Sequence, residues 1–436
     1  MTHEFKLNVI GCVVNRLQNL FFFGLFLFSA SSGSALDWQN SKNFLREKNY
    51  DYSYAVDQLE QARLTEKENL SLFLPQIDYI LKHEQSNDTL DVYERYYSSG
   101  LVLTQNLFNG GKDYYSYKSN QQKLSLEQLN FKLAKIKLQS ELKRLVAQLE
   151  YTQKSVALSE SIVVRRKENF ESVSLRYGTG YEDKAAVMLS EAYLVDSNLD
   201  IDVSKADYDQ ADKALKQFLG INQGEKLIWQ GTIPQKNITV LDDHTNIKFE
   251  EILKKCSTEH PLILQAQHEE RVKYFDHQVE QSGFFPMLDL TAKYTDYDSQ
   301  PQLQQSKWLV GLTLTIPLFS GFSTVTKNKS AELSYQQALK KTLNQTSFVV
   351  NQIHKSFANL KLAKTRVFVA EKYLKAAKLR AEYMHEKYNL GLAWFDRWDS
   401  AETSLIAREK DYLQSQRDLI VALADFEEAI AYDEEE

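Results

Sequence analysis

Long stretches of helix-forming residues, uninterrupted by glycine or proline, dominate the chain. No Gly or Pro occurs between Gly111 and Gly178 or between Gly321 and Gly391, and both stretches are rich in Leu, Ala, Lys, Glu and Gln. Apolar residues within them recur at alternating spacings of four and three, the period of a coiled-coil seam. One helix over residues 112–177 would be roughly 100 Å long at about 1.5 Å per residue. The pattern therefore predicts an extended rod and not a compact globular domain.

Shorter segments with alternating apolar and polar residues precede each long stretch. Residues 288–295 and 310–316 place Leu, Ala, Val, Tyr or Ile at every second position, and residues 77–81 and 101–107 repeat the pattern more weakly. Four strands of about ten residues are predicted. That length suits a tilted membrane strand, although amphipathic strands of a soluble sheet look the same locally.

The two halves of the sequence correspond at a constant offset of 211 residues. Pro75 corresponds to Pro286 at this offset, and Gly110 corresponds to Gly321. The same order of strand, turn, long helix, turn and helix follows in both halves, which indicates an internal duplication. Further pairs are Asp78 with Asp289, Gly100 with Gly311, Phe108 with Phe319, Tyr177 with Tyr388, and Gly180 with Gly391.

The duplication predicts a domain organisation of two tandem repeats. Each repeat is expected to contain a helix, two strands, a long helix and a second helix. We place the first repeat at residues 36–220, the joining segment at 221–247 and the second repeat at 248–436.

The first 35 residues are typical of a signal peptide. Lys6 and Arg16 precede or flank a short apolar run at 20–28, and small residues follow it up to Ala35. The run is too short to span a bilayer as a helix, and an uncleaved anchor helix is the alternative. Lipidation at Cys12 is rejected because that cysteine precedes the apolar run.

The predicted strands are too few to form a membrane barrel alone. The smallest membrane barrels have about eight strands, and an open sheet edge in lipid leaves backbone groups unpaired. If these strands span a membrane, several copies of the chain must contribute to one barrel.

Composition excludes several other classes of protein. The negative mean hydropathy of -0.45 excludes a polytopic helical membrane protein. The net charge of -7 is spread along the chain, which argues against a nucleic-acid partner, and two cysteines exclude a disulfide scaffold. We expect no enzyme, metal or cofactor, because the sequence lacks His-x-x-x-His, Gly-x-Ser-x-Gly and Gly-x-Gly-x-x-Gly motifs in the required contexts.

Paired turn motifs give the chain a resemblance to a known family. The segments Leu107–Gly111 and Pro317–Phe322 lie between strand and long helix, Arg176–Gly180 and Lys387–Leu392 lie at the next turn, and His260–Ile263 lies early in the second repeat. Two copies of these motifs in the same order resemble the TolC-type outer membrane efflux protein family over essentially the whole chain after residue 35. The strand–helix turn residues are Leu107, Phe108, Gly110, Gly111, Pro317, Leu318, Phe319 and Gly321.

The resemblance implies a fold that is mainly α-helical with a β membrane part. Three chains would each give four strands to a shared 12-stranded β-barrel in outer-membrane lipid, and a long coiled-coil α-barrel would extend into the periplasm. It implies a homotrimer in the outer membrane of a Gram-negative bacterium.

The resemblance also implies the function of a passive exit duct. Such a channel serves a tripartite efflux pump or a type I secretion system, with a periplasmic adaptor and a proton-driven or ABC inner-membrane transporter as partners. The alternative is a periplasmic adaptor or another exported coiled-coil interaction protein, which would also contain long heptad hairpins.

Candidate constriction residues lie after the second long helix. The family carries two Asp residues at the channel entrance, but Arg397 and Ser400 occupy those positions here, and Asp396 and Asp399 lie one residue earlier. Our hypothesis is that Asp396, Arg397 and Asp399 line or lock the constriction. A solvated helix face with an Asp–Arg pair is the alternative.

The turns at 178–181 and 389–392 are the candidate contacts for an adaptor. Tyr388 beside them is expected either to hydrogen-bond to a neighbouring coil and hold the channel shut, or to end the apolar seam. Gly178, Gly180 and Gly391 are expected to supply positive φ angles. The tip residues are Gly178, Thr179, Gly180, Asn389, Leu390, Gly391 and Leu392.

Overall fold

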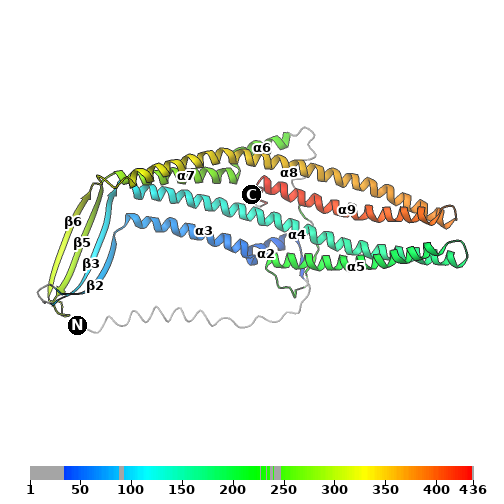
Figure 1. Cartoon of the computed structure of the whole chain (residues 1–436), viewed down its shortest axis with the longest axis horizontal. Helices are drawn as coiled ribbons and strands as arrows, with labels where there is room; N and C mark the ends of the chain where they lie inside the picture. Colours follow the sequence, from blue (N-terminus) through cyan, green and yellow to red (C-terminus); the bar gives the residue numbers. More distant parts are fainter. Residues whose placement is uncertain are drawn as a thin grey trace.

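The computed structural model describes residues 34–87, 93–225, 227–231, 233–235, 239 and 247–434. The chain is long and narrow, with a sheet at one end and two helical hairpins at the other (Figure 1). The segment predicted as a signal peptide lies outside the described residues up to position 33. Ser34 and Ala35 belong to a short strand that pairs in parallel with residues 227–229.

The first repeat contains helices on both sides of two strands. Its long helix has 67 residues, which gives a length of about 100 Å. The elements are β1 (Ser34–Leu36), α2 (Trp38–Lys48), α3 (Tyr50–Glu68), a 3-10 turn (Asn69–Phe73), β2 (Gln76–Asn87), β3 (Tyr93–Asn109), α4 (Lys112–Gly178) and α5 (Lys184–Leu219).

The second repeat has the same order of elements, and its long helix also has 67 residues. Strand β4 lies between the repeats. The elements are β4 (Leu227–Trp229), α6 (Ile247–Glu259), α7 (Pro261–Gln281), a 3-10 turn (Ser282–Phe284), β5 (Met287–Asp298), β6 (Gln305–Thr315), α8 (Ser323–Asn389) and α9 (Phe395–Ala429).

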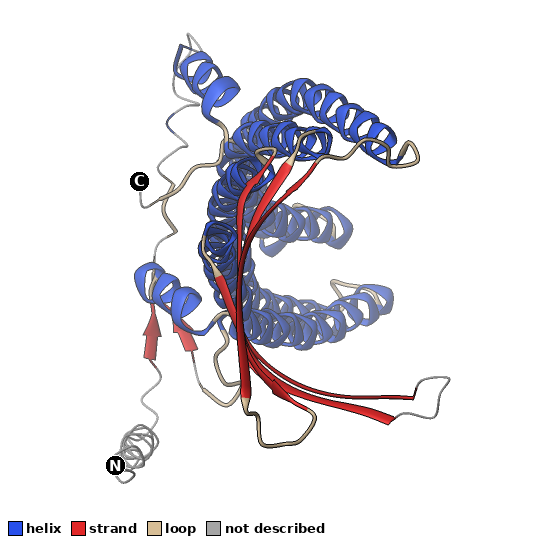
Figure 2. Cartoon of the chain, turned by 90° about the vertical axis from the view of Figure 1, so that its left-hand side faces the viewer, coloured by secondary structure: helices blue, strands red, loops and turns tan. Residues whose placement is uncertain are grey.

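The two long helices carry different partners along their length. Near the sheet, α4 and α8 pack with α3 and α7; towards the tips they pack with α5 and α9. Figure 2 shows these helices arranged around an arc that is open on one side. The seam predicted from sequence is buried at Leu142, Leu149, Ile353 and Leu360, so the coiled-coil interpretation of both stretches is confirmed.

A capped helix break occurs at the same place in both repeats. Asn49 starts α3: its side-chain oxygen accepts from the Tyr52 amide at 2.8 Å, and its amide donates to the Phe218 carbonyl at 2.6 Å. His260 starts α7 in the same way, with Nδ1 accepting from the Leu262 amide at 3.2 Å and Nε2 3.2 Å from the Ala429 carbonyl. Asn49 therefore joins the start of α3 to the end of α5, and His260 joins the start of α7 to the end of α9.

The His260 cap predicts a loss of stability in mild acid. A protonated imidazole cannot accept the Leu262 hydrogen bond, and burial lowers the pKa of His260 below its ordinary 6.5. The stabilisation is therefore present above about pH 6.5 and lost as the pH falls, by at most about 1.4 kcal/mol per pH unit. Asparagine makes the equivalent bonds at position 49, so His260→Asn is expected to remove this part of the pH dependence.

Urea unfolding between pH 7.5 and pH 5.5 measures this effect. The same change at exposed His385 is the control and is expected to leave the slope unaltered. An unchanged slope in His260→Asn would contradict the role of His260.

The four long strands form one antiparallel sheet in the order β2-β3-β5-β6. Within the described residues β2 and β6 each pair on one side, so both edges of the sheet are open. β3 and β5 approach closely at Gly100, where a Cβ atom would lie 2.2 Å from the Tyr294 carbonyl oxygen. The strand predictions at 77–81, 101–107, 288–295 and 310–316 are confirmed, apart from the last residue of the fourth, Ile316, which follows β6.

Candidate functional site

The sheet has one continuous apolar face, which the strand register produces. Tyr79, Leu101, Tyr294 and Trp308 are cross-strand neighbours in one row across all four strands. The next row on the same face holds Ile77, Leu103, Ala292 and Val310. Trp308 is 77% exposed and Val310 62% exposed within the chain, so this apolar face lacks a covering element among the described residues.

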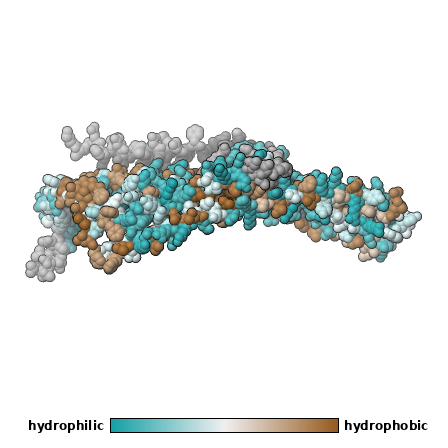
Figure 3. Space-filling view, turned by 90° about the horizontal axis from the view of Figure 1, so that it is seen from above, coloured by the Kyte–Doolittle hydropathy of each residue, from teal (hydrophilic) through white to brown (hydrophobic). Residues whose placement is uncertain are grey.

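The opposite face of the sheet is mainly polar, with Ile80, Val102 and Leu309 as its apolar exceptions. One row contains Gln76, Thr104, Thr291 and Gly311, and Asn106 donates a hydrogen bond to Asp289 at 3.0 Å on the same face. Apolar side chains gather at the sheet end in the space-filling view (Figure 3). An apolar face and a polar face on one sheet are the arrangement of strands that separate lipid from water.

The strand–helix turns also present apolar side chains to the surface. Leu107 and Phe108 are about half exposed, and Leu318 and Phe319 are exposed by 92% and 79%. Gly110, Gly111 and Gly321 adopt positive φ angles, as does Phe322, a residue for which that conformation is costly. Pro317 lies in the loop before this turn.

At the other end of the rod, Tyr388 joins the two hairpins of the chain. Its side chain is 1% exposed, and its hydroxyl donates to the Glu182 carboxylate at 2.8 Å. Arg176 donates to the Tyr388 carbonyl at 2.6 Å and lies 4.5 Å from the centre of its ring. Burial and the bond to Glu182 raise the pKa of Tyr388, so the hydroxyl remains a donor at physiological pH.

Trp398 packs the centre of this joint. It is 2% exposed and stacks on Tyr388 with ring centres 4.4 Å apart. Phe395 meets it edge-on at 6.2 Å, and Val173 and Ala186 of the first hairpin complete the cluster. Tyr388 therefore ends the seam and also bonds to a neighbouring coil.

The predicted constriction residues divide into two groups. Asp396 and Arg397 are exposed at the start of α9. Asp399 is instead paired with Arg166 of α4 at 2.9 Å, and Arg166 lies over the ring of Tyr193 on α5. Burial and the Asp399 carboxylate raise the pKa of Tyr193.

Sequence reasoning missed the arginines that join α4 to α9. Arg165 donates to Glu402 at 2.9 Å and to Glu409 at 2.6 Å, and both carboxylates are largely buried. Arg166 also donates to Thr403 at 3.0 Å. The adjacent arginines at 165 and 166, and acids spaced along 396–409, were the signal available in the sequence.

The hairpin tips expose apolar side chains. Leu390 and Leu392 are 73% and 72% exposed, and two further tip residues that no sequence motif marked, Tyr181 and Trp394, are 79% and 81% exposed. Gly180 and Gly391 have positive φ angles, as predicted. The prediction for Gly178 was wrong: it is the last residue of α4 and keeps a negative φ, because the turn reverses at Gly180.

The remaining tip residues close the helix ends. Thr179 donates from its hydroxyl to the Arg176 carbonyl at 3.0 Å. Asn389 ends α8 and lies 3.0 Å from the His385 ring. Both contacts are made within the tips, and the apolar side chains of the tips remain exposed.

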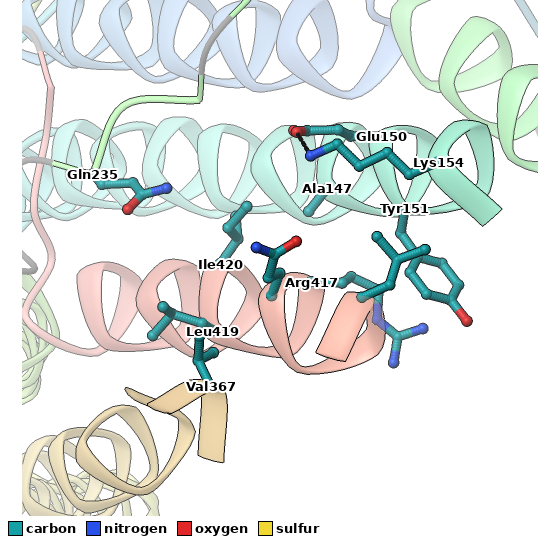
Figure 4. A pocket seen from close by; sticks show the side chains of 11 residues that line it. Ala147, Glu150, Tyr151, Lys154, Gln235, Val367, Arg417, Leu419 and Ile420 are labelled. Atoms are coloured by element: carbon teal, nitrogen blue, oxygen red, sulfur yellow. Dashed lines mark hydrogen bonds and ion pairs between the residues drawn. The ribbon is translucent and has the colours of Figure 1, made fainter. Parts of the chain in front are cut away.

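A cavity of about 260 Å³ lies beside the α4–α9 junction (Figure 4). Glu150 in its lining pairs with Lys154 at 2.6 Å, and Arg417 lies 4.8 Å from the centre of the Tyr151 ring. The described residues of this lining include no Ser, Cys or His. In the part of the chain that the structure describes, no group of three His, Cys, Asp or Glu side chains is placed to hold a metal ion. Of the described helices, none is both long and apolar enough to cross a membrane.

The chain has the fold of solved outer-membrane channel proteins. Residues 252–431 match the model of the outer membrane efflux protein family. The resemblance to TolC-type channels is thus confirmed, with the family match in the second repeat and the shared fold covering 94% of the chain. Among curated proteins no sequence relative is found.

Solved channel structures share the fold at low sequence identity. The chain is similar to the channel CusC, with a TM-score of 0.79, 17% identity and coverage of 94% of this chain and 95% of that one. It is similar to VceC of Vibrio cholerae, with a TM-score of 0.78, 14% identity and coverage of 90% and 95%. It is also similar to the open state of the Neisseria gonorrhoeae channel MtrE, with a TM-score of 0.74, 17% identity and coverage of 92% and 93%.

Proposed function

We propose that this chain is the protomer of an outer-membrane exit duct for a tripartite efflux pump or a type I secretion system. The observation that carries the proposal is the four-stranded sheet with one apolar face, one polar face and two open edges, joined to a rod of about 100 Å. In lipid, the backbone hydrogen-bonding groups at the two edges of such a sheet are paired when copies of the chain join edge to edge.

A homotrimer is the assembly that the resemblance to the outer membrane efflux protein family favours. Edge β2 of one copy would pair with edge β6 of the next, so three copies would close a 12-stranded barrel. The apolar row containing Tyr79 and Trp308 would face lipid, and the polar row containing Thr104 and Thr291 would face the water-filled duct.

The hairpin tips are the proposed contact for a periplasmic adaptor. Leu390, Leu392, Tyr181 and Trp394 lie at one end of the rod with 72–81% of their surface exposed. Apolar side chains gathered in this way are typical of a protein interface. The adaptor would couple the duct to a proton-driven or ABC transporter of the inner membrane.

The joint around Tyr388 is the proposed gate. It lies directly behind the tips and holds the two hairpins of one chain together through Glu182 and Arg176. Breaking these bonds would let the hairpins separate and widen the periplasmic end. Asp396 and Arg397, exposed beside the joint, are the side chains proposed to meet permeating ions.

Substitution of the two aspartates separates gating from ion selection. Asp396→Asn is expected to lower the preference for cations, because it removes one exposed carboxylate per copy. Asp399→Asn is expected to raise the open probability with little change in preference, because it removes the charged one of the two bonds from Arg166 to α9. Single-channel recording in planar bilayers measures both quantities. Unchanged ion selectivity in Asp396→Asn would contradict the placement of Asp396 at the channel entrance.

Conductance and export together test the proposed function. The purified protein is expected to require detergent for extraction, to run as an oligomer and to form pores in planar bilayers. Its deletion is expected to lower the export of a toxic compound or a secreted protein. Extraction as a monomer without detergent would instead support a periplasmic coiled-coil adaptor.

A further inference from the structure

A second cavity, of about 540 Å³, lies where the long helices change partners along their length. At this level α9 ends at Ala429 and α7 begins at Pro261, so two helix ends meet beside α4 and α8. Side chains of all four helices line the cavity. A volume of this size is sufficient for a small organic molecule.

The face of α8 that lines the cavity is turned away from α6. Phe357 of α8 stacks on Phe249 of α6, a helix that lies outside the arc of long helices (Figure 2). Phe348 and Lys355 line the cavity and precede Phe357 by nine and two residues. At about 100° per residue, both therefore lie on the opposite side of α8 from Phe357.

The lining from α4 faces in the same direction. Lys135 of α4 pairs at 2.8 Å with Asp433, which lies beside α6 residues. Lys137 and Arg144 line the cavity and follow Lys135 by two and nine residues, so they lie on the opposite side of α4. The cavity is thus on the concave side of the arc, which would face the duct in the proposed ring of copies.

The cavity offers an apolar surface on this concave side. Ile136 and Val349 are almost fully buried, whereas Phe348 is 50% exposed. Leu133 of α4 and Leu262 of α7 complete the apolar part of the lining. A ring or a short hydrocarbon body bound here would lose contact with water on several sides.

Arg144 already engages the carboxylates of the lining. Its guanidinium pairs with Asp425 at 2.8 Å and with Glu428 at 2.5 Å. Glu141, outside the lining, is bonded to the same guanidinium at 3.0 Å. The acids around the cavity are therefore directed towards Arg144.

Two lysines of the lining have no such partner. Lys137 of α4 and Lys355 of α8 are exposed, and in the described part of the chain neither is paired with a carboxylate. Gln352 and Asn359 place amide groups on the same wall as Lys355. An anionic group that enters the cavity thus meets two ammonium groups and hydrogen-bond donors beside an apolar surface.

We propose that this cavity is a transient binding site for amphiphilic organic anions that pass through the duct. The apolar part of the molecule packs against Phe348 and the leucines of the lining, and its anionic group lies beside Lys137 or Lys355. The proposal rests on the proposed exit duct and identifies a class of molecule that the duct carries. Exposed lysines hold an anion weakly, so the molecule can leave again, as passage through a channel requires.

Equilibrium dialysis of 1-naphthalenesulfonate against the purified oligomer in nanodiscs tests the site at low salt. The sulfonate is expected to bind at least tenfold more tightly than 1-naphthylmethylammonium, a cation with the same ring system. Lys137→Gln combined with Lys355→Gln is expected to weaken sulfonate binding about tenfold or more, because both charged partners are lost. Phe348→Ala is expected to weaken it about threefold or more, because apolar contact is lost.

A matched control removes one exposed lysine from each long helix at positions outside the cavity. Lys123→Gln combined with Lys340→Gln is expected to leave sulfonate binding unchanged. An equal loss of affinity in this control overturns the proposal. Equal binding of the sulfonate and the ammonium by the wild type also overturns it.

Charge reversal gives a readout that poor folding cannot imitate. Lys137→Glu combined with Lys355→Glu is expected to invert the preference, so that the ammonium binds more tightly than the sulfonate. An unchanged preference overturns the proposal. Pores in planar bilayers without lysine-dependent binding would overturn the site and leave the proposed function intact, whereas lysine-dependent binding without pores would count against the proposed function.

Discussion

Trp398→Ala is expected to lower the local stability of the hairpin joint by about 3–5 kcal/mol, the range for removal of a buried tryptophan. The side chain is almost fully buried between Tyr388, Phe395 and the first hairpin, so its loss leaves a cavity where the hairpins meet. Native-state hydrogen exchange measures this local stability. The amides around Tyr388 and Val173 are expected to exchange faster, while those near Leu142 keep their protection.

Two further variants establish that the effect comes from packing. Trp398→Phe retains an aromatic ring against Tyr388 and is expected to lose less than half as much stability. Leu392 lies at the same tip, and its apolar side chain is 72% exposed. Leu392→Ala is therefore expected to change hydrogen exchange little. Equal exchange in Trp398→Ala and the wild type would show that the hairpins are held together elsewhere.

Lys143→Met is expected to destabilise the whole chain by about 3–5 kcal/mol. The Lys143 ammonium lies between the carboxylates of Glu427 and Glu434, with only 3% of its side chain exposed. Trp38 donates to Glu434 at 3.0 Å, so this cluster joins the beginning of the described chain to its end. Removing the cation deprives the buried Glu427 carboxylate of its ion pair with Lys143.

Urea unfolding followed by helical circular dichroism measures the loss. Adding Glu427→Leu to Lys143→Met is expected to recover much of it, because an apolar pair replaces the ion pair. Lys213→Met breaks an exposed pair with Asp209 and is the matched control, with an expected change of about 0–1 kcal/mol. A loss in Lys143→Met no larger than in Lys213→Met would contradict the role of this cluster.

The architecture could be predicted because it depends on regular, local signals. The long helices follow from the absence of Gly and Pro, and the strands follow from alternation at 77–81 and 288–295. The 211-residue offset recurs in the structure with equal lengths of α4 and α8. The break at Asn49 was missed because asparagine and tyrosine give no strong helix stop, whereas His260-Pro261 marks the equivalent break more clearly.

The details of the joint were less predictable because they depend on pairing between distant segments. Tyr388 was selected, but nothing in the sequence identified Glu182, Arg176 or Trp398 as its neighbours. Asp399 was grouped with Asp396 by spacing, and only the fold shows that Arg166 reaches it. Phe322 adopts a positive φ at the position where the first repeat has Gly111, a substitution that propensity alone would not suggest.

Carrying both repeats in one chain changes how the neighbours in the rod come together. A chain with a single repeat would have to find every neighbour by collision, and all of its junctions would depend on concentration. With two repeats in one chain, the α4–α9 junction forms as part of monomer folding, at an effective concentration set by the connecting segment. Arg165 and the buried Arg166 lie at that junction, where their acidic partners belong to the same chain.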